Sequence, residues 1–416
     1  MEFVSVMNTV LGIVFFVCYF YQFVYIAVPF LVKAKPHLPE KKHTFALLIS
    51  ARNEEAVIGN LLDSIKQQDY PAQLVRVFVV ADNCTDATAQ AARNAGATVY
   101  ERFDTEKVGK GYALDYLLTC IGRDFPSGFD GYMVFDADNV LEKNYITEMN
   151  RTFSDGHEVI TGFRNSKNYG SNWISAGYAL WFLRESSFLN RSRMRLNTSC
   201  TISGTGYMFS RLILDEIGGW PFHLLTEDVE FTAWLITHGY KVAYCEKAVL
   251  YDEQPVDFAQ SWRQRMRWSR GFLQVIGKYG LKLLRSIFSR NGFSAYDISM
   301  TIMPAYVLTI TAAAVNCGGF VWDVLHKSVG ALYIIGGLWG IFQGIYLTMF
   351  LIGGITVICE WKNIYCSNWK KILYWFTFPL FMATYIPISV AALFRRVEWK
   401  PIRHTHAVTL DEITKC

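Results

Sequence analysis

Residues 3–32 contain no charged side chain, and this stretch limits where the start of the chain can fold. A helix of this length spans the roughly 30 Å hydrocarbon core of a bilayer with some tilt. Four lysines follow it between residues 33 and 42. Under the positive-inside rule, they put the amino terminus outside and the next residues in the cytoplasm. We therefore predict an uncleaved transmembrane signal anchor over residues 1–33.

A second apolar region lies near the other end of the chain. Apolar residues make up 52% of the sequence and aromatic residues 16%, which is more than a soluble domain usually holds. Apolar spans at residues 298–322, 329–359 and 372–394 predict a transmembrane region over residues 297–394. A basic, aromatic tail follows at residues 395–416. The chain is therefore expected to be a multi-pass protein of the cell membrane.

The basic residues around the last span conflict with the number of predicted crossings over the side of the membrane on which this tail lies. Three crossings from a cytoplasmic domain would place the tail outside. The lysines at 370–371 and the arginines at 395–396 instead favour the cytoplasm on both sides of the span. A re-entrant last span, buried against protein, would resolve the conflict, and the two prolines within it favour that arrangement. We expect a cytoplasmic tail and leave the number of crossings open.

Between the two apolar regions, short apolar strands alternate with helices. The expected strands are 45–50, 75–81 and 132–135, and the expected helices are 54–67 and 85–95. This alternation predicts an α/β domain with a mostly parallel sheet covered by helices on both faces. Ligands bind beyond the carboxyl ends of the strands in such sheets.

Acidic residues stand at these strand ends. Asp82 closes the second strand, and Asp136 and Asp138 follow the third. Carboxylate oxygens suit Mg²⁺ or Mn²⁺, and nothing in the pattern chooses between the two ions. An ordinary acidic turn is the alternative. We predict a metal site at Asp136 and Asp138.

Two further segments have the composition of a phosphate or nucleotide site. Gly109-Lys110-Gly111 combines a point charge with residues that let a phosphate approach the backbone closely. Residues 50–54 close the first strand, where an Asn-capped turn is the alternative. On an expected amphipathic helix over residues 258–282, Gln264, Arg267 and Trp268 share one face at i, i+3 and i+4. That face can grip a diphosphate and stack a sugar, although a basic helix that binds anionic lipid is the plainer alternative.

In chain order, these motifs and Thr226-Glu227-Asp228 resemble those of processive family-2 glycosyltransferases. This group includes cellulose, chitin, hyaluronan and poly-N-acetylglucosamine synthases. The resemblance runs from about His43 to about Gly277. It implies a cytoplasmic GT-A-like domain over residues 43–256 and interface helices over residues 257–296.

The resemblance also implies a role for each motif. Asp228 is the expected catalytic base, and Glu227 orients it or the acceptor. The expected contacts of the nucleotide sugar are Ala51, Asn53, Glu54, Asp82, Lys110, Asp136, Gln264 and Arg267. The expected contacts of the acceptor are Ser203, Gly204, Thr205 and Trp268. Taken alone, the Thr-Glu-Asp motif would be a helix cap and residues 203–206 a tight turn.

The implied function is inverting transfer from UDP-N-acetylglucosamine or UDP-glucose. The enzyme would elongate a β-linked polysaccharide at the cytoplasmic membrane face and export it, with possible accessory export subunits as partners. The alternative is a non-processive transferase that adds one sugar to a membrane lipid. A third hypothesis is a transporter or scaffold that only binds nucleotide. It does not explain why a base, a metal pair and a diphosphate clamp occur together.

Composition excludes two other classes. A formal net charge of +4 is too small to indicate a nucleic-acid binder. The nine cysteines form no C-x-x-C pair, so the sequence predicts neither a zinc site nor a disulfide framework.

Overall fold

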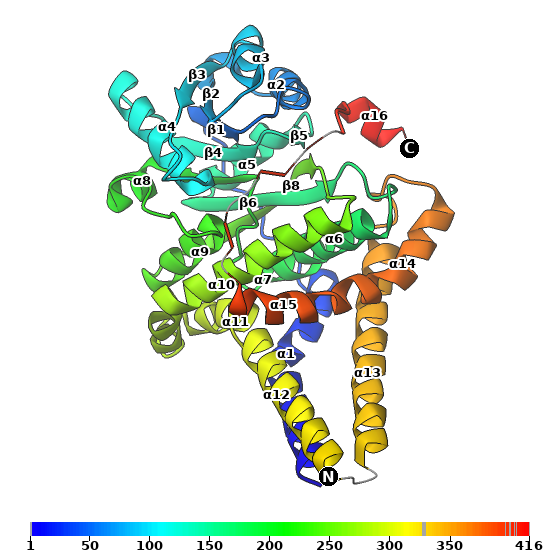
Figure 1. Cartoon of the computed structure of the whole chain (residues 1–416). Coiled ribbons are helices and arrows are strands. Elements are labelled where there is room, and N and C mark those ends of the chain that lie inside the picture. Colours follow the sequence, from blue (N-terminus) through cyan, green and yellow to red (C-terminus); the bar gives the residue numbers. More distant parts are fainter. Residues whose placement is uncertain are drawn as a thin grey trace.

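A mixed β-sheet with helices on both faces stands above a layer of helices lying crosswise, and three long helices project below that layer (Figure 1). The computed structural model describes residues 2–326, 330–395, 397–398, 401–402, 404 and 406–415. Several residues of the predicted basic tail, including Trp399 and Arg403, lie outside these ranges, as does the predicted start of the second carboxy-terminal span at Val329.

The sheet has eight strands among the described residues, in the order β3-β2-β1-β4-β7-β6-β8-β5. The strands are β1 (Phe45–Ala51), β2 (Val75–Asp82), β3 (Thr98–Arg102), β4 (Gly131–Asp136), β5 (Val140–Leu141), β6 (Val159–Ser166), β7 (Tyr207–Ser210) and β8 (Val242–Asp252). The order β3-β2-β1-β4 is parallel throughout, and so is the pair β6-β8. Strand β7 runs antiparallel to both of its neighbours, and β5 runs antiparallel to β8. The predicted parallel sheet is therefore found in one half, and the other half is mixed.

Helices cover both faces because the strands are apolar on both sides. In β1, Phe45 and Ile49 face one core and Leu48 faces the other, as the twofold repeat of a strand requires. The helices of this domain are α2 (Ile58–Lys66), α3 (Thr88–Asn94), α4 (Lys110–Asp124), α5 (Tyr145–Ser154), α6 (Trp173–Arg184), α7 (Arg191–Arg195), α8 (Arg211–Ile217) and α9 (Glu227–Thr237). The short segments η1 (Ala72–Leu74) and η2 (Glu185–Asn190) complete it.

Two predicted helices begin later than expected. The helix predicted from residue 54 begins at Ile58, and the one predicted from residue 85 begins at Thr88. Side chains bind the backbone of both turns. The Asp86 carboxylate accepts the Thr88 N–H at 3.1 Å and the Glu55 N–H at 3.2 Å. These bonds replace helical ones, so the turns stay non-helical.

The crosswise layer consists of α10 (Phe258–Ser286), α11 (Gly292–Ile302), α14 (Asn368–Ala383) and α15 (Tyr385–Phe394) (Figure 1). Helix α14 packs on α6, where Phe381 joins Ile174 and Tyr178 in a buried cluster. Helix α10 is tied to the junction of α14 and α15 by the Arg265 guanidinium, which donates to Thr384 Oγ1 at 2.6 Å. The last predicted span is thus two helices that pack against the α/β domain.

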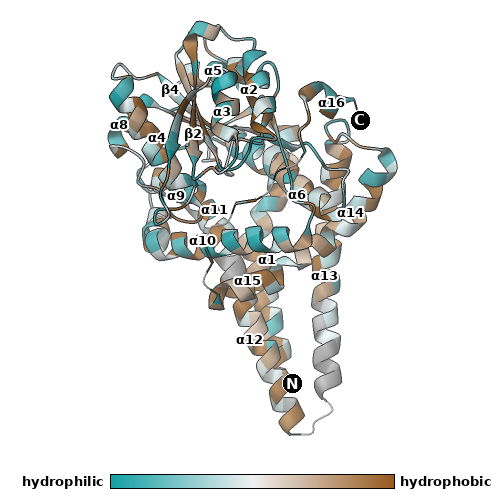
Figure 2. Ribbon diagram, turned by 45° about the horizontal axis from the view of Figure 1, so that its top comes forward, coloured by the Kyte–Doolittle hydropathy of each residue, from teal (hydrophilic) through white to brown (hydrophobic). Residues whose placement is uncertain are grey.

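The three projecting helices are α1 (Glu2–Leu31), α12 (Pro304–Leu325) and α13 (Gly330–Cys359). Helices α1 and α12 lie side by side, and Asn8 and Asn316 exchange hydrogen bonds of 2.9 and 3.0 Å between them. Among the described residues, three stretches are long and apolar enough to cross a membrane: Phe3–Leu31, Phe342–Cys359 and Asn368–Phe394. Hydrophobic residues dominate α12, whereas hydrophilic residues are common on the outside of the α/β domain (Figure 2).

The first predicted carboxy-terminal span, over residues 298–322, is divided in the structure. Its beginning belongs to α11, which ends at Ile302, and α12 then starts at Pro304. Proline lacks an N–H and disfavours helical geometry at the residue before it, so it suits the first position of a new helix. The crosswise helix α11 and the projecting helix α12 therefore replace the single predicted span.

Candidate active site

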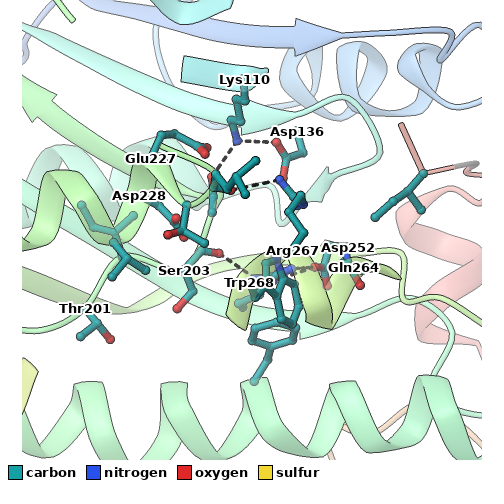
Figure 3. Close-up of a pocket in the computed structure, with 18 of the residues that line it drawn as sticks. Lys110, Asp136, Thr201, Ser203, Glu227, Asp228, Asp252, Gln264, Arg267 and Trp268 are labelled. Atoms are coloured by element: carbon teal, nitrogen blue, oxygen red, sulfur yellow. Dashed lines mark hydrogen bonds and ion pairs between the residues drawn. The ribbon is translucent and has the colours of Figure 1, made fainter. Parts of the chain in front are cut away.

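A cavity of about 490 Å³ opens below the carboxyl ends of the strands and extends to the crosswise helices. Its walls come from the ends of β1, β2, β4 and β8, from the starts of α4 and α9, and from one face of α10. Figure 3 shows Lys110 and Asp136 on one side of this cavity and Gln264, Arg267 and Trp268 across from them. Residues from segments far apart in the sequence therefore meet in one place.

The first wall lies at the ends of β1 and β2. Ala51, Glu54 and Asp82 all line the cavity. The Arg102 guanidinium donates to Asp82 Oδ1 at 2.6 Å and holds that carboxylate in place. Burial raises the pKa of Asp82, while Arg102 opposes the rise. The opposite oxygen of Asp82 keeps lone pairs for a ligand, because a carboxylate accepts several hydrogen bonds.

Lys110 and Asp136 form an ion pair at the start of α4. The Lys110 ammonium donates to Asp136 Oδ1 and, at 2.7 Å, to the Gly204 carbonyl. Burial acts against the charge of this lysine, but Asp136 and Glu227 outweigh it and raise the lysine pKa. The amine is therefore cationic and faces the cavity. The neighbouring Gly111 is needed for packing, since a Cβ there would lie 2.0 Å from the Phe222 carbonyl oxygen.

Asp138 lies just beyond, almost fully buried at 4% exposure. Its Oδ2 accepts the Glu253 N–H at 2.7 Å. Burial acts to raise its pKa, but the nearby cations His404 and Lys167 outweigh this and lower it. Asp136 and Asp138 both line the cavity and offer hard oxygen donors, which fit Mg²⁺ or Mn²⁺. No group of three metal-ligating side chains exists among the residues that the structure describes, so a ligand would have to supply further oxygens.

Glu227 and Asp228 project from the first turn of α9. Both line the cavity, and Glu227 is buried whereas Asp228 is half-buried. Burial, together with the charge of Asp228, raises the pKa of Glu227 to about 7. Burial also raises the pKa of Asp228. Raised carboxyl pKa values near neutral pH are typical of general acid–base groups.

The three residues predicted to share one face of α10 do point to the same cavity. Gln264, Arg267 and Trp268 all line the cavity (Figure 3). Arg267 Nη1 donates to the Leu225 carbonyl at 3.4 Å, next to the Thr-Glu-Asp turn. The Trp268 ring is held edge-on by Tyr178 and Phe182, with centroid distances of 5.7 and 6.1 Å. These edge contacts fix the orientation of the ring in the cavity wall.

The remaining predicted residues divide into lining and supporting positions. Ser203 and Gly204 line the cavity, and a Cβ on Gly204 would lie 3.9 Å from Asp228 Oδ2. Thr205 and Asn53 do not line it in the described part of the chain. Thr205 Oγ1 accepts the Asp136 N–H at 2.9 Å, and Asn53 Oδ1 accepts the Thr85 N–H at 2.8 Å. These two side chains hold loops in shape behind the cavity wall.

Sequence reasoning missed several residues of the site. Arg164, Glu185, Asp252, Glu253 and His404 line the cavity as well. Asp252 ends strand β8, so the rule that acidic residues at strand ends reach the site could have found it. Burial raises the pKa of Asp252 to about 6. The Arg164 guanidinium bonds this carboxylate and donates to the Ser203 carbonyl at 2.7 Å, which links the end of β8 to the loop at Ser203.

The carboxy-terminal tail also reaches the cavity. His404 Nδ1 lies 2.9 and 3.0 Å from the two carboxylate oxygens of Glu54. Burial lowers the pKa of this imidazole, but Asp138 and Glu54 outweigh it and bring the pKa to about 10. The imidazole is therefore cationic and neutralises Glu54. No local sequence pattern marks His404, because its partner is 350 positions away.

Comparison with known proteins gives the family. Residues 42–271 match the model described as "Glycosyltransferase like family 2". The chain is 26% identical over 332 residues to the probable glycosyltransferase YdaM of Bacillus subtilis, covering 74% of this chain and 73% of that protein. It is 27% identical to the beta-monoglucosyldiacylglycerol synthase of Synechocystis, with coverage of 55% of this chain and 47% of that protein. It is 23% identical to the poly-beta-1,6-N-acetyl-D-glucosamine synthase of Staphylococcus epidermidis, with coverage of 59% and 61%.

Thus the chain matches about half of the length of the Synechocystis protein. Among solved structures, the mannosyltransferase PcManGT from Pyrobaculum calidifontis, in complex with GDP-Man and Mn²⁺, has the same fold. The TM-score is 0.59 at 17% sequence identity, covering 94% of this chain and 99% of that one. Because the family model covers more than half of the sequence, the chain belongs to glycosyltransferase family 2, and it is a glycosyltransferase with a GT-A-like fold.

Proposed function

We propose that this protein is an inverting glycosyltransferase that uses a UDP-sugar, UDP-N-acetylglucosamine or UDP-glucose, to elongate a β-linked polysaccharide at the cytoplasmic face of the cell membrane. One observation carries the proposal. A carboxylate suited to act as base, two cations suited to a diphosphate and a carboxylate pair suited to a metal line the same cavity. The experiment that tests it is a panel of UDP-sugars, with release of UDP as the readout. No release from any sugar nucleotide would refute it.

The donor fits the upper part of the cavity. Asp82 can accept the N–H of a uracil ring, and Lys110 and Arg267 can neutralise the diphosphate. A Mg²⁺ or Mn²⁺ ion held by Asp136 and Asp138 would neutralise charge that develops on the leaving diphosphate. Binding of the donor has to displace Lys110 partly from Asp136, since the two are now paired. The lysine then has a phosphate oxygen as its new partner.

Transfer follows from the position of Asp228. Its carboxylate accepts the proton of the acceptor hydroxyl, whose oxygen attacks the anomeric carbon while the bond to the diphosphate breaks. Attack opposite the leaving group inverts the configuration. Glu227 and Asp228 share a buried site, so one proton on Glu227 reduces the repulsion between them. Lys110 and Arg267 face the developing negative charge and stabilise it.

A polymer acceptor is supported by Trp268, which lines the same cavity as Ser203 and Gly204 and on whose ring a sugar can stack. The helix that carries Trp268 leads into the membrane-facing layer of α11 and α15. Synthesis at this place would deliver the product directly to the bilayer. The similarity to a poly-beta-1,6-N-acetyl-D-glucosamine synthase supports the same interpretation.

A second candidate function is addition of a single sugar to a membrane lipid, and one observation favours it. Part of the cavity wall is apolar, with Phe272, Ile298, Met382 and Ile386 from the crosswise layer and Leu189 from η2. An acyl chain would suit this wall. The similarity to a beta-monoglucosyldiacylglycerol synthase agrees with it. Sizing the product separates the two functions, because a mono- or diglycosyl lipid as sole product favours the second.

We propose a topology in which α1, α12 and α13 cross the bilayer and α14 and α15 lie at its cytoplasmic surface. Three crossings that begin outside end in the cytoplasm, which agrees with the paired basic residues at 370–371 and 395–396. The packing of α14 on α6 and the contact of His404 with Glu54 support this topology. The tail and the catalytic cavity would then lie on one side of the membrane.

Export of a polymer gives a directly measurable expectation. In sealed inverted vesicles supplied with radiolabelled UDP-sugar, we expect the labelled polymer inside the lumen, protected from an added glycosidase. Detergent should expose all of it to the enzyme, which serves as the control for sealing. If the glycosidase digests all of the product before detergent is added, the product lies outside the vesicles and export is refuted.

Substitution of the metal pair should weaken nucleotide binding. We expect Asp136→Asn and Asp138→Asn each to lower the affinity for UDP in the presence of Mn²⁺ by at least about 10-fold, since each removes one anionic oxygen ligand. Calorimetry with and without Mn²⁺ measures this. The exposed Asp63 on α2 gives the matched control, Asp63→Asn, which should bind normally. Unchanged affinity in both site variants would contradict the metal assignment.

A further inference from the structure

We propose that Glu185 is an additional acceptor-binding residue, whose free carboxylate oxygen binds a hydroxyl group of the acceptor sugar. The inference rests on the proposed function and extends it to a segment outside all of the motifs described above. Glu185 lines the cavity and accepts a hydrogen bond from Ser203, one of the predicted acceptor contacts. It lies between α6 and α7 in the chain, in a part of the sequence that predicted no site residue.

The backbone around Glu185 has an unusual geometry. Residues Glu185–Asn190 form η2, a π-helical segment between α6 and α7. Such segments are rare and occur frequently at functional sites, because the wider turn redirects side chains. The remaining residues of this segment are buried, whereas Glu185 is only half-buried and borders the cavity. Glu185 and Leu189 of this segment both line the cavity, and Glu185 is the anionic one of the two.

One oxygen of Glu185 is occupied and the other is available. Oε1 accepts hydrogen bonds from Ser203 Oγ at 2.6 Å and from Thr201 Oγ1 at 2.8 Å. Among the described residues, Oε2 has no hydrogen-bond partner, and no lysine or arginine forms an ion pair with this carboxylate. The charges of Arg164 and Arg184 act on this half-buried carboxylate, although neither forms a hydrogen bond with it among the described residues. A hydroxyl donor of a ligand would supply the hydrogen bond that Oε2 lacks. Two lone pairs of Oε2 remain for hydroxyl donors.

The surroundings hold this carboxylate rigidly beside the reacting position. Thr201 Oγ1 also accepts from Arg193 Nη1 at 3.1 Å, and Arg193 is itself fixed by Asp297. Ser203 is the other partner of Glu185, and it precedes Gly204 in the chain. Gly204 is close to Asp228 in space, because a Cβ on it would lie 3.9 Å from Asp228 Oδ2. Glu185 can therefore bind a hydroxyl group near the one that Asp228 deprotonates. A rigid, preorganised hydrogen-bond acceptor of this kind orients an acceptor more than it strengthens donor binding.

The ligand class is a polyhydroxylated group, since a carboxylate accepts from neutral hydroxyls through short, charge-assisted bonds. A glycan end and a glycolipid headgroup both present such hydroxyls. The two sources differ in the group attached to the sugar, which is a further sugar in a glycan and an acyl-bearing glycerol in a glycolipid. The test therefore uses two probes: a β-linked N-acetylglucosamine tetrasaccharide, and monoglucosyl diacylglycerol in phosphatidylglycerol vesicles. The probe that accelerates UDP release in the wild-type protein identifies the source.

With that probe, Glu185→Gln keeps the shape and the bonds from Ser203 and Thr201 but removes the charge. We expect its KM for the acceptor to rise about 10-fold and that of Glu185→Ala to rise more, as the loss of a hydrogen bond to a charged group predicts. The KM for the UDP-sugar and the slow release of UDP without acceptor should change by a much smaller factor than the KM for the acceptor. Glu216→Gln, the same change at an exposed position on α8, is the matched control and should behave as wild type.

Two results would overturn the inference. The first is an unchanged acceptor KM in both Glu185 variants. The second is a fall in UDP release without acceptor that is as large, as a factor, as the change in the acceptor KM. That result would mean that Glu185 only holds the loop at Ser203 in shape. Failure of the proposed function itself looks different, because the wild-type protein would then release no UDP from any sugar nucleotide.

Discussion

Asp228→Asn is expected to lower kcat by roughly 10²–10⁴, with little change in the affinity for UDP, as loss of a general base predicts. The amide has the shape of the carboxylate but cannot take the proton of the acceptor hydroxyl. The donor site should remain intact because its proposed contacts Asp82, Lys110 and Asp136 lie on other elements, namely β2, α4 and β4. Steady-state rates of UDP release with acceptor, together with calorimetry of UDP binding, measure the two effects separately.

The pH profile gives a second readout of the same variant. Burial raises the pKa of both Glu227 and Asp228, that of Glu227 to about 7. A base works only when deprotonated, so the wild-type rate should increase as the pH rises through the raised pKa of Asp228, while Glu227 keeps its proton. The remaining activity of Asp228→Asn should lose this dependence. Asp63→Asn serves as control, and wild-type turnover in the Asp228 variant would show that the base is misassigned.

The strand ends of the fold could be predicted because their signal is local. An apolar run followed by an acidic residue identifies Asp82 and Asp136, and parallel strands bring such ends to one edge. Strand β1 begins at the predicted residue and extends one residue further. Asp252 obeys the same rule at the end of β8. The mixed half of the sheet could not be predicted in this way, since the antiparallel direction of β7 depends on how the chain returns rather than on its composition.

Supporting and long-range contacts were beyond sequence reasoning for a physical reason. Whether Asn53 or Thr205 faces a ligand or a neighbouring loop depends on hydrogen bonds with Thr85 and Asp136, which are remote in the chain. His404 depends in the same way on Glu54. Hydropathy likewise identified the apolar segments near the end of the chain, but it did not show in which direction the helices that they form run. The break before Pro304 and the packing of α14 on α6 decide which of these helices project.

A buried ion pair joins the projecting helix α1 and the crosswise helix α11 to the proposed acceptor side of the cavity. Arg193 on α7 donates to both oxygens of Asp297 on α11 at 2.7 and 2.8 Å, and their side chains are 1% and 2% exposed. The hydroxyl groups of Tyr21 and Tyr25 on α1 donate to the same carboxylate, each at 2.8 Å. Arg193 in turn bonds Thr201 in the loop that ends at the acceptor site. The position of that loop therefore depends on α1 and α11.

Asp297→Asn should accordingly destabilise the protein by about 3–5 kcal/mol, because it leaves the Arg193 guanidinium buried without a counter-ion. Urea titration in detergent, followed by tryptophan fluorescence, measures the loss. Adding Arg193→Met to the same chain should recover much of it, since the uncompensated charge is then gone while the amide still accepts from Tyr21 and Tyr25. Asp215→Asn breaks an exposed pair with Arg211 and should cost only a small fraction of that amount. Equal losses in the Asp297 and Asp215 variants would contradict the role of this pair, because burial is the property that distinguishes them.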